Sequence, residues 1–229
     1  MLLIQNLSAT VEQKSVLNNI NLEIQSGETV ALIGHNGSGK SSLAQIICGN
    51  KDYICNSESI VLCNDKNLLE LEPHSISRLG LFVSFQNPVE VPNVPLLSYL
   101  KLISDESRLS KKLAKFSAKE FMIKTRKNLE LLEWNESWLK RNLNEGMSGG
   151  EKKKSEILQL LTLDPEFVVL DEIDSGLDTQ SLKIIGQILH KLQQARKTIV
   201  IITHNKTILE FLRVDRTVEL KDGTILSAQ

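Results

Sequence analysis

The sequence Gly34-His-Asn-Gly-Ser-Gly-Lys-Ser41 has the spacing G-x-x-x-x-G-K-[ST] of a phosphate-binding loop. The apolar stretch 29–33 before it predicts a short buried strand, and 42–48 after it predicts a helix that ends at Gly49. Glycines between a strand and a helix let the backbone curl, so that successive N–H groups point inward. The stretch therefore predicts a polyphosphate site at a helix N-terminus, and its flanking elements argue against a chance glycine-rich turn.

The composition is that of an ordinary soluble globular protein. The chain has 229 residues, 41% apolar and 24% charged, with a net charge of −1. The chain lacks the excess of basic residues expected of a protein that binds nucleic acid or an anionic membrane surface. No apolar run approaches the ~18 residues of a membrane span. The first residues lack the basic and apolar regions of a secretory signal. These features predict a cytoplasmic protein, or one of a similar soluble compartment such as an organelle stroma or matrix, with no direct membrane insertion.

Three cysteines, Cys48, Cys55 and Cys63, lie close together in the sequence. An odd number in a chain of this size fits a reducing compartment better than a disulfide framework. Their spacing matches no common metal-ligand pattern. We therefore expect Cys48 to pack as a small hydrophobic side chain on the helix after the phosphate loop.

Apolar strands alternate with helical patterns over much of the chain, which predicts a largely parallel sheet covered on both faces. Before the phosphate loop, alternating residues predict two strands of a half-buried sheet. The expected strands are 2–7, 16–24, 29–33, 59–63, 81–85, 167–170 and 198–202, with a hairpin at 217–226. The expected helices include 150–163, 179–195 and 205–212, the last capped by Asn205, and a short helical piece within 67–79.

The segment from Pro88 to Gly146 differs in character. Three prolines punctuate its start, and apolar residues at three-and-four spacing predict helices after them. We interpret it as a helical insertion in an α/β domain. Trp134 and Trp138 are expected to close its small core rather than to stack on a nucleobase.

Polar residues follow three of the predicted strands. The apolar strand 167–170 ends in Asp171-Glu172, which suits Mg²⁺ binding by the first acid and general-base catalysis by the second better than a plain surface turn. Gln86 ends another strand, and His204 follows the strand 198–202. Because the carboxyl ends of parallel strands border one crevice, we expect these side chains to meet at the phosphate loop.

The turn Met147-Ser-Gly-Gly-Glu151 opens a predicted helix and offers a second anion-binding N-terminus. Taken alone, this turn is common and carries little information. Together with Gln86, Asp171-Glu172, Ser175-Gly-Leu-Asp178 and His204 in this order, it becomes specific.

These ordered motifs resemble those of ABC-type ATPases along the whole chain. The resemblance pairs 34–41 with Walker A, Gln86 with the Q-loop, Met147–Glu151 with the LSGGQ signature, Asp171-Glu172 with Walker B and the catalytic glutamate, Ser175–Asp178 with the D-loop, and His204 with the switch histidine. It implies a nucleotide-binding domain with a RecA-like, mostly parallel sheet, an N-terminal antiparallel β part and a helical insertion. It also implies one domain over 1–229, with 1–87 and 147–229 as the α/β core and 88–146 as the helical subdomain.

The resemblance further implies Mg²⁺-dependent hydrolysis of ATP to ADP and phosphate. It implies a transient head-to-tail dimer, in which ATP lies between the phosphate loop of one subunit and the signature turn of the other. The implied residues are Gly34, His35, Asn36, Gly37, Ser38, Gly39, Lys40, Ser41 and Ser42 for ATP; Glu172, His204 and Gln86 for catalysis; Ser41, Gln86 and Asp171 for Mg²⁺; Ser148, Gly149, Gly150 and Glu151 for the signature; and Ser175, Gly176, Leu177 and Asp178 for the D-loop.

Finer features are similar to the SufC family, the ABC ATPases of iron–sulfur cluster assembly. They are 85–92, 149–153 with 156–159, and 171–178. Transporter ATPases more often carry Pro where this chain has Ile173, and Gln where it has Glu151. The resemblance implies a SufB/SufD-type scaffold partner, contacted through the helical insertion and the loop 86–95. The alternatives are the ATPase subunit of a membrane transporter, or a nucleotide-holding module without turnover, against which an intact Glu172 and His204 argue.

Overall fold

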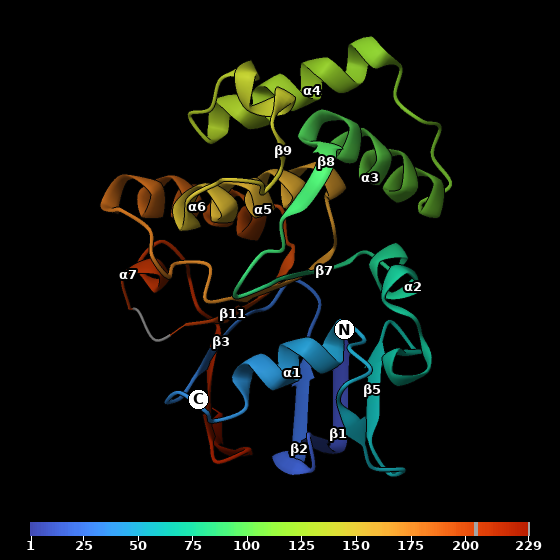
Figure 1. Cartoon of the computed structure of the whole chain (residues 1–229). Coiled ribbons are helices and arrows are strands. Elements are labelled where there is room, and N and C mark those ends of the chain that lie inside the picture. Colours follow the sequence, from blue (N-terminus) through green and yellow to red (C-terminus); the bar gives the residue numbers. More distant parts are fainter. Residues whose placement is uncertain (204–205, 229) are drawn as a thin grey trace.

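A six-stranded sheet in the order β13-β12-β3-β11-β10-β7 forms the centre of the computed structural model, which describes residues 1–203 and 206–228 (Figure 1). Neighbouring strands run parallel except for the hairpin of β12 and β13. The strands are β3 (Thr29–Ile33), β7 (Leu81–Ser84), β10 (Phe167–Asp171), β11 (Thr198–Ile202), β12 (Arg216–Lys221) and β13 (Thr224–Ala228). The predicted mostly parallel sheet is confirmed.

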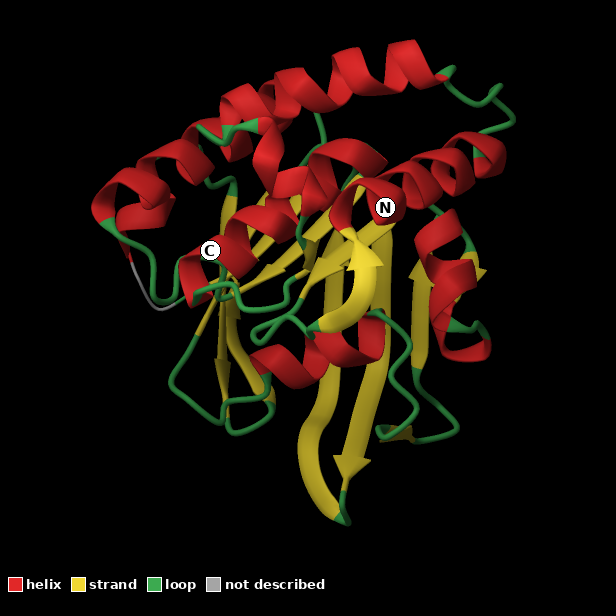
Figure 2. Cartoon of the chain, turned by 45° about the horizontal axis from the view of Figure 1, so that its top comes forward, coloured by secondary structure: helices red, strands yellow, loops and turns green. Residues whose placement is uncertain are grey.

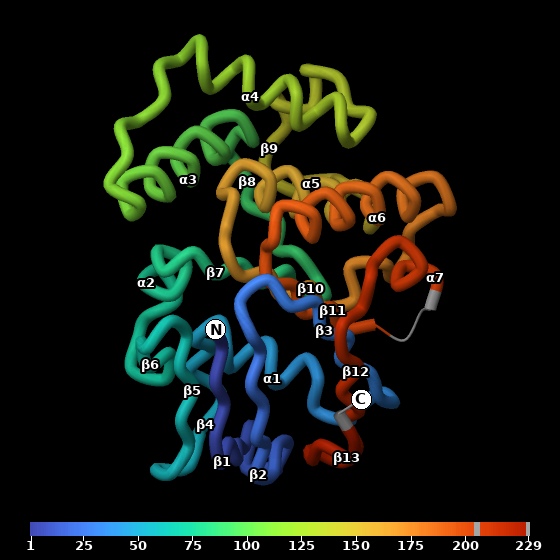
Figure 3. The backbone as a smooth tube through the Cα atoms, turned by 180° about the vertical axis from the view of Figure 1, so that it is seen from behind, coloured from blue at the N-terminus to red at the C-terminus, as the bar shows by residue number. Residues whose placement is uncertain are grey.

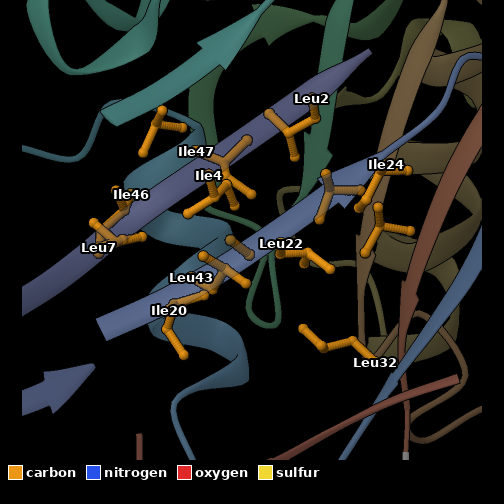
Figure 4. Close-up of a cluster of buried hydrophobic side chains, with 14 of the residues drawn as sticks. Leu2, Ile4, Leu7, Ile20, Leu22, Ile24, Leu32, Leu43, Ile46 and Ile47 are labelled. Carbon is orange, nitrogen blue, oxygen red and sulfur yellow. The ribbon is translucent and has the colours of Figure 1, made fainter. Parts of the chain in front are cut away.

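A second, antiparallel sheet is built by the N-terminal part of the chain. It has the order β2-β1-β5-β6, with β4 paired to β1. Its strands are β1 (Leu2–Val11), β2 (Lys14–Ile24), β4 (Ile54–Cys55), β5 (Ile60–Cys63) and β6 (Lys66–Asn67). Alternate residues of β1 and β2 point inward and meet α1 (Lys40–Ile47), where Leu43, Ile46 and Ile47 complete the cluster shown in Figure 4.

Helices cover both faces of the six-stranded sheet (Figure 2). In β10, Val169 packs into the cluster that contains α1, whereas Val168 and Leu170 pack into a second cluster on the other face. That second cluster contains α5 (Gly149–Leu163) and α6 (Thr179–Gln194). Because both faces are buried, the strands read as continuous apolar runs in the sequence.

Residues 88–146 form mainly helices, which lie beyond α5 and α6 as seen from the sheet (Figure 3). They are α3 (Leu96–Ser110), α4 (Ala118–Leu131) and the 3₁₀ helix η2 (Glu136–Lys140). Trp134 and Trp138 stack with ring centroids 4.3 Å apart and pack into the apolar cluster, as expected. Their rings therefore stabilise this helical segment.

A two-stranded ribbon in this segment was not predicted. It pairs β8 (Val91–Pro95) with β9 (Asn142–Leu143). Proline cannot donate to a ladder, so Pro92 and Pro95 predict a loop, yet proline is tolerated at such irregular strand edges. The ribbon brings the two ends of the segment 88–146 together.

Some helix bounds also differ from prediction. Helix α1 begins at Lys40 rather than at Ser42, because the left-handed Gly39 serves as its N-cap. The short pieces η1 (Leu68–Glu70) and α2 (Pro73–Arg78) replace one helical stretch. The last helix, α7, is Lys206–Leu209, and its predicted cap Asn205 lies outside the described residues.

Candidate functional site

The phosphate loop packs so closely on its surroundings that glycine is required at its first position. A Cβ on Gly34, which has a φ of 150°, would lie 2.2 Å from the Leu220 carbonyl oxygen. A Cβ on Gly39 would lie 2.7 Å from Leu17 Cδ2. The loop is thus wedged between β12 and β2.

Lys40 is buried at the start of α1. Its Nζ donates to the carbonyl oxygens of Gly34 at 2.8 Å and His35 at 2.9 Å. Burial lowers the pKa of Lys40, while the nearby carboxylates of Glu172 and Asp171 act in the opposite direction. The ammonium group is therefore held inside the curl of the loop, where a phosphate chain would be bound.

The first turn of α1 keeps its backbone donors available. Its N-cap is Gly39, which makes no side-chain hydrogen bond to the helix. A cavity of about 390 Å³ opens there, lined by residues 36–42 together with Val16, Gln86 and Glu172. This volume is within the usual range for small-molecule sites. Uncapped N–H groups, the helix dipole and Lys40 together suit an anionic ligand.

Asp171 ends β10 next to the loop. Ser41 Oγ donates to Asp171 Oδ1 at 3.2 Å, and the Asp171 N–H donates to Ser84 Oγ at 3.0 Å. Burial raises the pKa of Asp171, and Glu172 adds to this effect, while the Ser41 hydrogen bond opposes it. A hydroxyl and a carboxylate this close, with the Gln86 amide at the same cavity, form the all-oxygen donor set that Mg²⁺ prefers.

Glu172 turns toward the cavity because its backbone leaves the strand direction. Its φ is 48°, and its N–H donates to the Ile202 carbonyl oxygen at 2.9 Å. Gln86 Nε2 donates to Glu172 Oε2 at 2.6 Å, so the ends of β7 and β10 meet as the parallel sheet predicts. His204 lies outside the described residues, and its predicted place stays a prediction.

The signature turn lies away from this cavity. Ser148 caps α5, and it forms a capping box with Glu151: the Ser148 N–H donates to Glu151 Oε2 at 2.7 Å, and the Glu151 N–H donates to Ser148 Oγ at 3.3 Å. A Cβ on Gly150 would lie 3.6 Å from Leu177 Cδ2, which places the turn beside the 175–178 stretch. The structure thus separates the two predicted anion sites within one chain.

The stretch 175–178 continues directly from the acids. The Ser175 N–H donates to the Glu172 carbonyl oxygen at 3.0 Å, and Asp178 caps α6 by accepting from the Ser181 N–H at 2.7 Å. That backbone hydrogen bond lowers the pKa of Asp178. The stretch 175–178 is therefore connected by hydrogen bonds to both Glu172 and the start of α6.

Three residues near the site had no individual role assigned to them from the sequence. Ser84 holds the backbone of Asp171, as described above. Lys153 and Glu156, both on α5, bond to the backbone of Phe85, the residue before Gln86. Lys153 stands in a run of three lysines, and only its burial in the structure distinguishes it from its neighbours.

The cysteines take no part in this site. Cys48 and Cys55 are half-buried and pack against the first apolar cluster, and Cys63 is buried within it. Burial raises the pKa of all three thiols. Within residues 1–203 and 206–228, no group of three His, Cys, Asp or Glu side chains is placed to hold a metal ion.

A family model described as ABC transporter matches residues 17–175, more than half of the chain. The chain therefore belongs to the ABC transporter family, as an ATPase domain that hydrolyses ATP with Mg²⁺ as its general cofactor. This confirms the predicted activity. In the part of the chain that the structure describes, no helix combines the length and apolar character needed to cross a membrane.

Named relatives agree with this family. The "Probable ATP-dependent transporter slr0075" of Synechocystis sp. is 38% identical over 226 residues, which cover 99% of this chain and 88% of that protein. The "Probable ATP-dependent transporter ycf16" of Cyanophora paradoxa is 38% identical over 97% of this chain and 86% of that protein. Among solved structures, the ATP-binding cassette MJ0796, described as a dimer bound to ADP and Pi after hydrolysis, has a TM-score of 0.83 at 25% identity and covers 100% of this chain and 98% of that chain.

Proposed function

We propose that this chain is the ATPase of an iron–sulfur cluster assembly complex, of the SufC type, and that ATP-driven dimerisation remodels a SufB/SufD-type scaffold. The observation that carries the proposal is Ile173, within the Asp171-Glu-Ile-Asp174 sequence, together with Glu151, since transporter ATPases more often carry Pro and Gln at these two positions. We propose a single domain over 1–229, with 88–146 as its helical subdomain, and a cytoplasmic or similar soluble compartment.

The proposed chemistry uses the cavity at α1. Residues 34–42 bind the phosphates of ATP through backbone N–H groups and Lys40. Ser41, Asp171 and Gln86 would hold Mg²⁺, which would neutralise phosphate charge there. Glu172 accepts a proton from the attacking water, and Gln86 and His204 orient that water. The 2.6 Å contact between Gln86 and Glu172 at the cavity supports these assignments.

We further propose a head-to-tail dimer. The turn 148–151 of one subunit would meet the ATP held by the other, with Ser175, Gly176, Leu177 and Asp178 at the same interface. Two observations support it: the turn does not line the cavity of its own chain, and the similar MJ0796 cassette is described as a dimer. Hydrolysis would then require two chains.

A groove of about 550 Å³ supports a partner beyond this dimer. It lies among α1, α2, β7, α3 and α5, and its lining includes Ile76, Phe82, Phe85 and Tyr99. The segment 86–95, which includes β8, follows directly from Phe85, and its Val89 is 73% exposed. Exposed apolar side chains beside a groove are typical of protein-binding surfaces, so we assign the scaffold contact to this region.

The second candidate is the ATPase subunit of a membrane transporter. It is favoured by the names of the relatives, which are called ATP-dependent transporters. The same hydrolysis chemistry would serve both functions, and only the partner differs. A membrane partner would use the same groove.

The Glu172→Gln variant tests both the proposed hydrolysis chemistry and the proposed partner. Loss of the general base should lower phosphate release by roughly 10² to 10⁴-fold while ATP binding is retained, which traps the closed dimer. The tagged variant is then purified from native cells with Mg-ATP. The matched control is the double variant that carries both Lys40→Ala and Glu172→Gln and cannot hold ATP.

The partner decides between the candidates. A partner without membrane spans that carries iron and sulfide supports cluster assembly, whereas a detergent-dependent partner with many spans supports transport. Hydrolysis by Glu172→Gln at the wild-type rate contradicts the general-base assignment in either case.

A further inference from the structure

Helix α5 carries a buried ion pair that the proposed chemistry does not use. Lys153 Nζ lies 3.6 Å from Glu156 Oε2, and the two side chains are only 4% and 6% exposed. Glu156 Oε2 makes no hydrogen bond. Apolar residues of similar volume usually stabilise a core at least as well as a buried ion pair, so stability alone does not account for these two residues.

The pair holds both backbone polar groups of one residue. The Phe85 N–H donates to Glu156 Oε1 at 2.9 Å, and Lys153 Nζ donates to the Phe85 carbonyl oxygen at 2.7 Å. The Phe85 side chain itself is 41% exposed. Phe85 is therefore fixed largely through its backbone, by α5, at the point where β7 ends.

The residue held in this way is next to Gln86. Gln86 Nε2 donates to Glu172 Oε2 at 2.6 Å, and Ser84 on the other side accepts from the Asp171 N–H. Residues 84–86 thus connect α5 to both acids of the site. Loosening Phe85 would let Gln86 move relative to Glu172.

We propose that Lys153 and Glu156 are positioning residues for ATP hydrolysis: by holding the backbone of Phe85, they keep Gln86 against Glu172 and tie that contact to the helix that the turn 148–151 begins. The proposal rests on the roles of Gln86 and Glu172 proposed above. Since α5 is a rigid element, a displacement of its N-terminus on an opposing ATP reaches Gln86 within about two turns of helix.

The first test compares adjacent lysines in the full chain. Lys153→Met removes the donor to Phe85 at nearly constant length, and Lys152→Met is the matched control, since Lys152 pairs instead with the partly exposed Glu90. We expect Lys153→Met to lower kcat by roughly 10- to 100-fold, as for other misplaced catalytic groups, with KM for ATP changed less than about twofold. Lys153→Arg should recover part of the loss, and Lys152→Met should remain within about twofold of wild type.

A second variant guards against misfolding. Glu156→Gln keeps an oxygen that can accept from the Phe85 N–H, so it should lose less activity than Glu156→Ala. Circular dichroism and MgATP binding establish that each variant is folded. Wild-type kcat in folded Lys153→Met and Glu156→Ala would overturn the proposal.

The third test asks whether the pair acts through Gln86. Adding Lys153→Met to Gln86→Ala should cost at most about twofold more, because the group that the pair positions is already absent. Full additivity would overturn the link to Gln86. Loss of activity in Gln86→Ala and Glu172→Gln, but not in Lys153→Met, would sink this inference alone, whereas wild-type activity in Glu172→Gln would sink the proposed function.

Discussion

The chain contains two helix N-termini with motifs for anions, and they differ in what already occupies them. Helix α1 begins at Gly39, which makes no side-chain hydrogen bond to the helix, with Lys40 held in the loop. Helix α5 begins at Ser148, and the carboxylate of Glu151 accepts from the Ser148 N–H. The first N-terminus is open and cationic, whereas the second is closed by its own acid.

This difference separates a preformed site from a conditional one. At α1 no side chain caps the helix, and the Lys40 ammonium inside the loop attracts an anion. At α5 an anion must approach a carboxylate and compete with its hydrogen bond to the Ser148 N–H, so binding there requires help from a second set of contacts. One chain alone would thus hold nucleotide at α1, and α5 would act only when another subunit presents the ligand.

The largest effect is expected at the open terminus. Lys40→Ala should lower ATP hydrolysis by more than roughly 1000-fold, because it removes the buried cation that the loop presents to the phosphates. Lys51→Ala, which removes an exposed lysine, is the control. Phosphate release and MgATP binding by the purified chain measure both variants. Appreciable turnover in Lys40→Ala would contradict the proposed difference between the N-termini of α1 and α5.

The pH dependence of stability should separate the two regions. Burial raises the pKa of Glu156 to about 7, from an ordinary value of 4.5. Between these values the folded chain keeps a proton that the unfolded chain has lost, so stability present below pH 4.5 is lost as the pH rises to about 7. Lys40 has a lowered pKa, so its contribution to stability changes with pH with the opposite sign.

Glu156→Gln isolates this effect because glutamine does not titrate. The unfolding free energy of the variant relative to wild type should rise between pH 4.5 and 7, by at most about 3 kcal/mol. Urea unfolding of both proteins at pH 5, 6, 7 and 8 measures the difference. A difference that is constant with pH would contradict the raised pKa.

The smallest effect is expected at the closed terminus. Glu151→Gln removes the negative charge but keeps an oxygen that can accept from the Ser148 N–H. A charge at a helix N-terminus changes the interaction free energy there by about 0.3–1 kcal/mol. If the Glu151 charge opposes the incoming phosphate by this amount, its removal should lower the concentration of chain that gives the half-maximal ATPase rate about two- to fivefold. Glu145→Gln is the control on the same loop. An unchanged or higher half-maximal concentration would show that Glu151 does not oppose the incoming phosphate.

The sequence predicted the site most reliably where spacing alone determines geometry. Residues 34–41 and the strand ends at Gln86 and Asp171-Glu172 meet as expected, because a parallel sheet brings its carboxyl ends together. The assigned roles at these positions stay predictions until the variants above are measured.

What the sequence could not predict depends on tertiary burial. Lys152, Lys153 and Lys154 look alike on the first turns of a helix, and only the packing of α5 on the end of β7 buries the middle one. The ribbon of β8 and β9 was missed because it joins residues about fifty positions apart, and its prolines predict a loop. Local pattern does not report such contacts.

The left-handed backbone of Glu172 has a consequence for how this protein can change. A φ of 48° costs an ordinary L-residue roughly 1–2 kcal/mol, which glycine would avoid. Optimising this chain for thermostability alone would therefore favour replacing the residue that we propose as the general base. Under the proposed role, the strain at this position is a cost in stability that accompanies turnover.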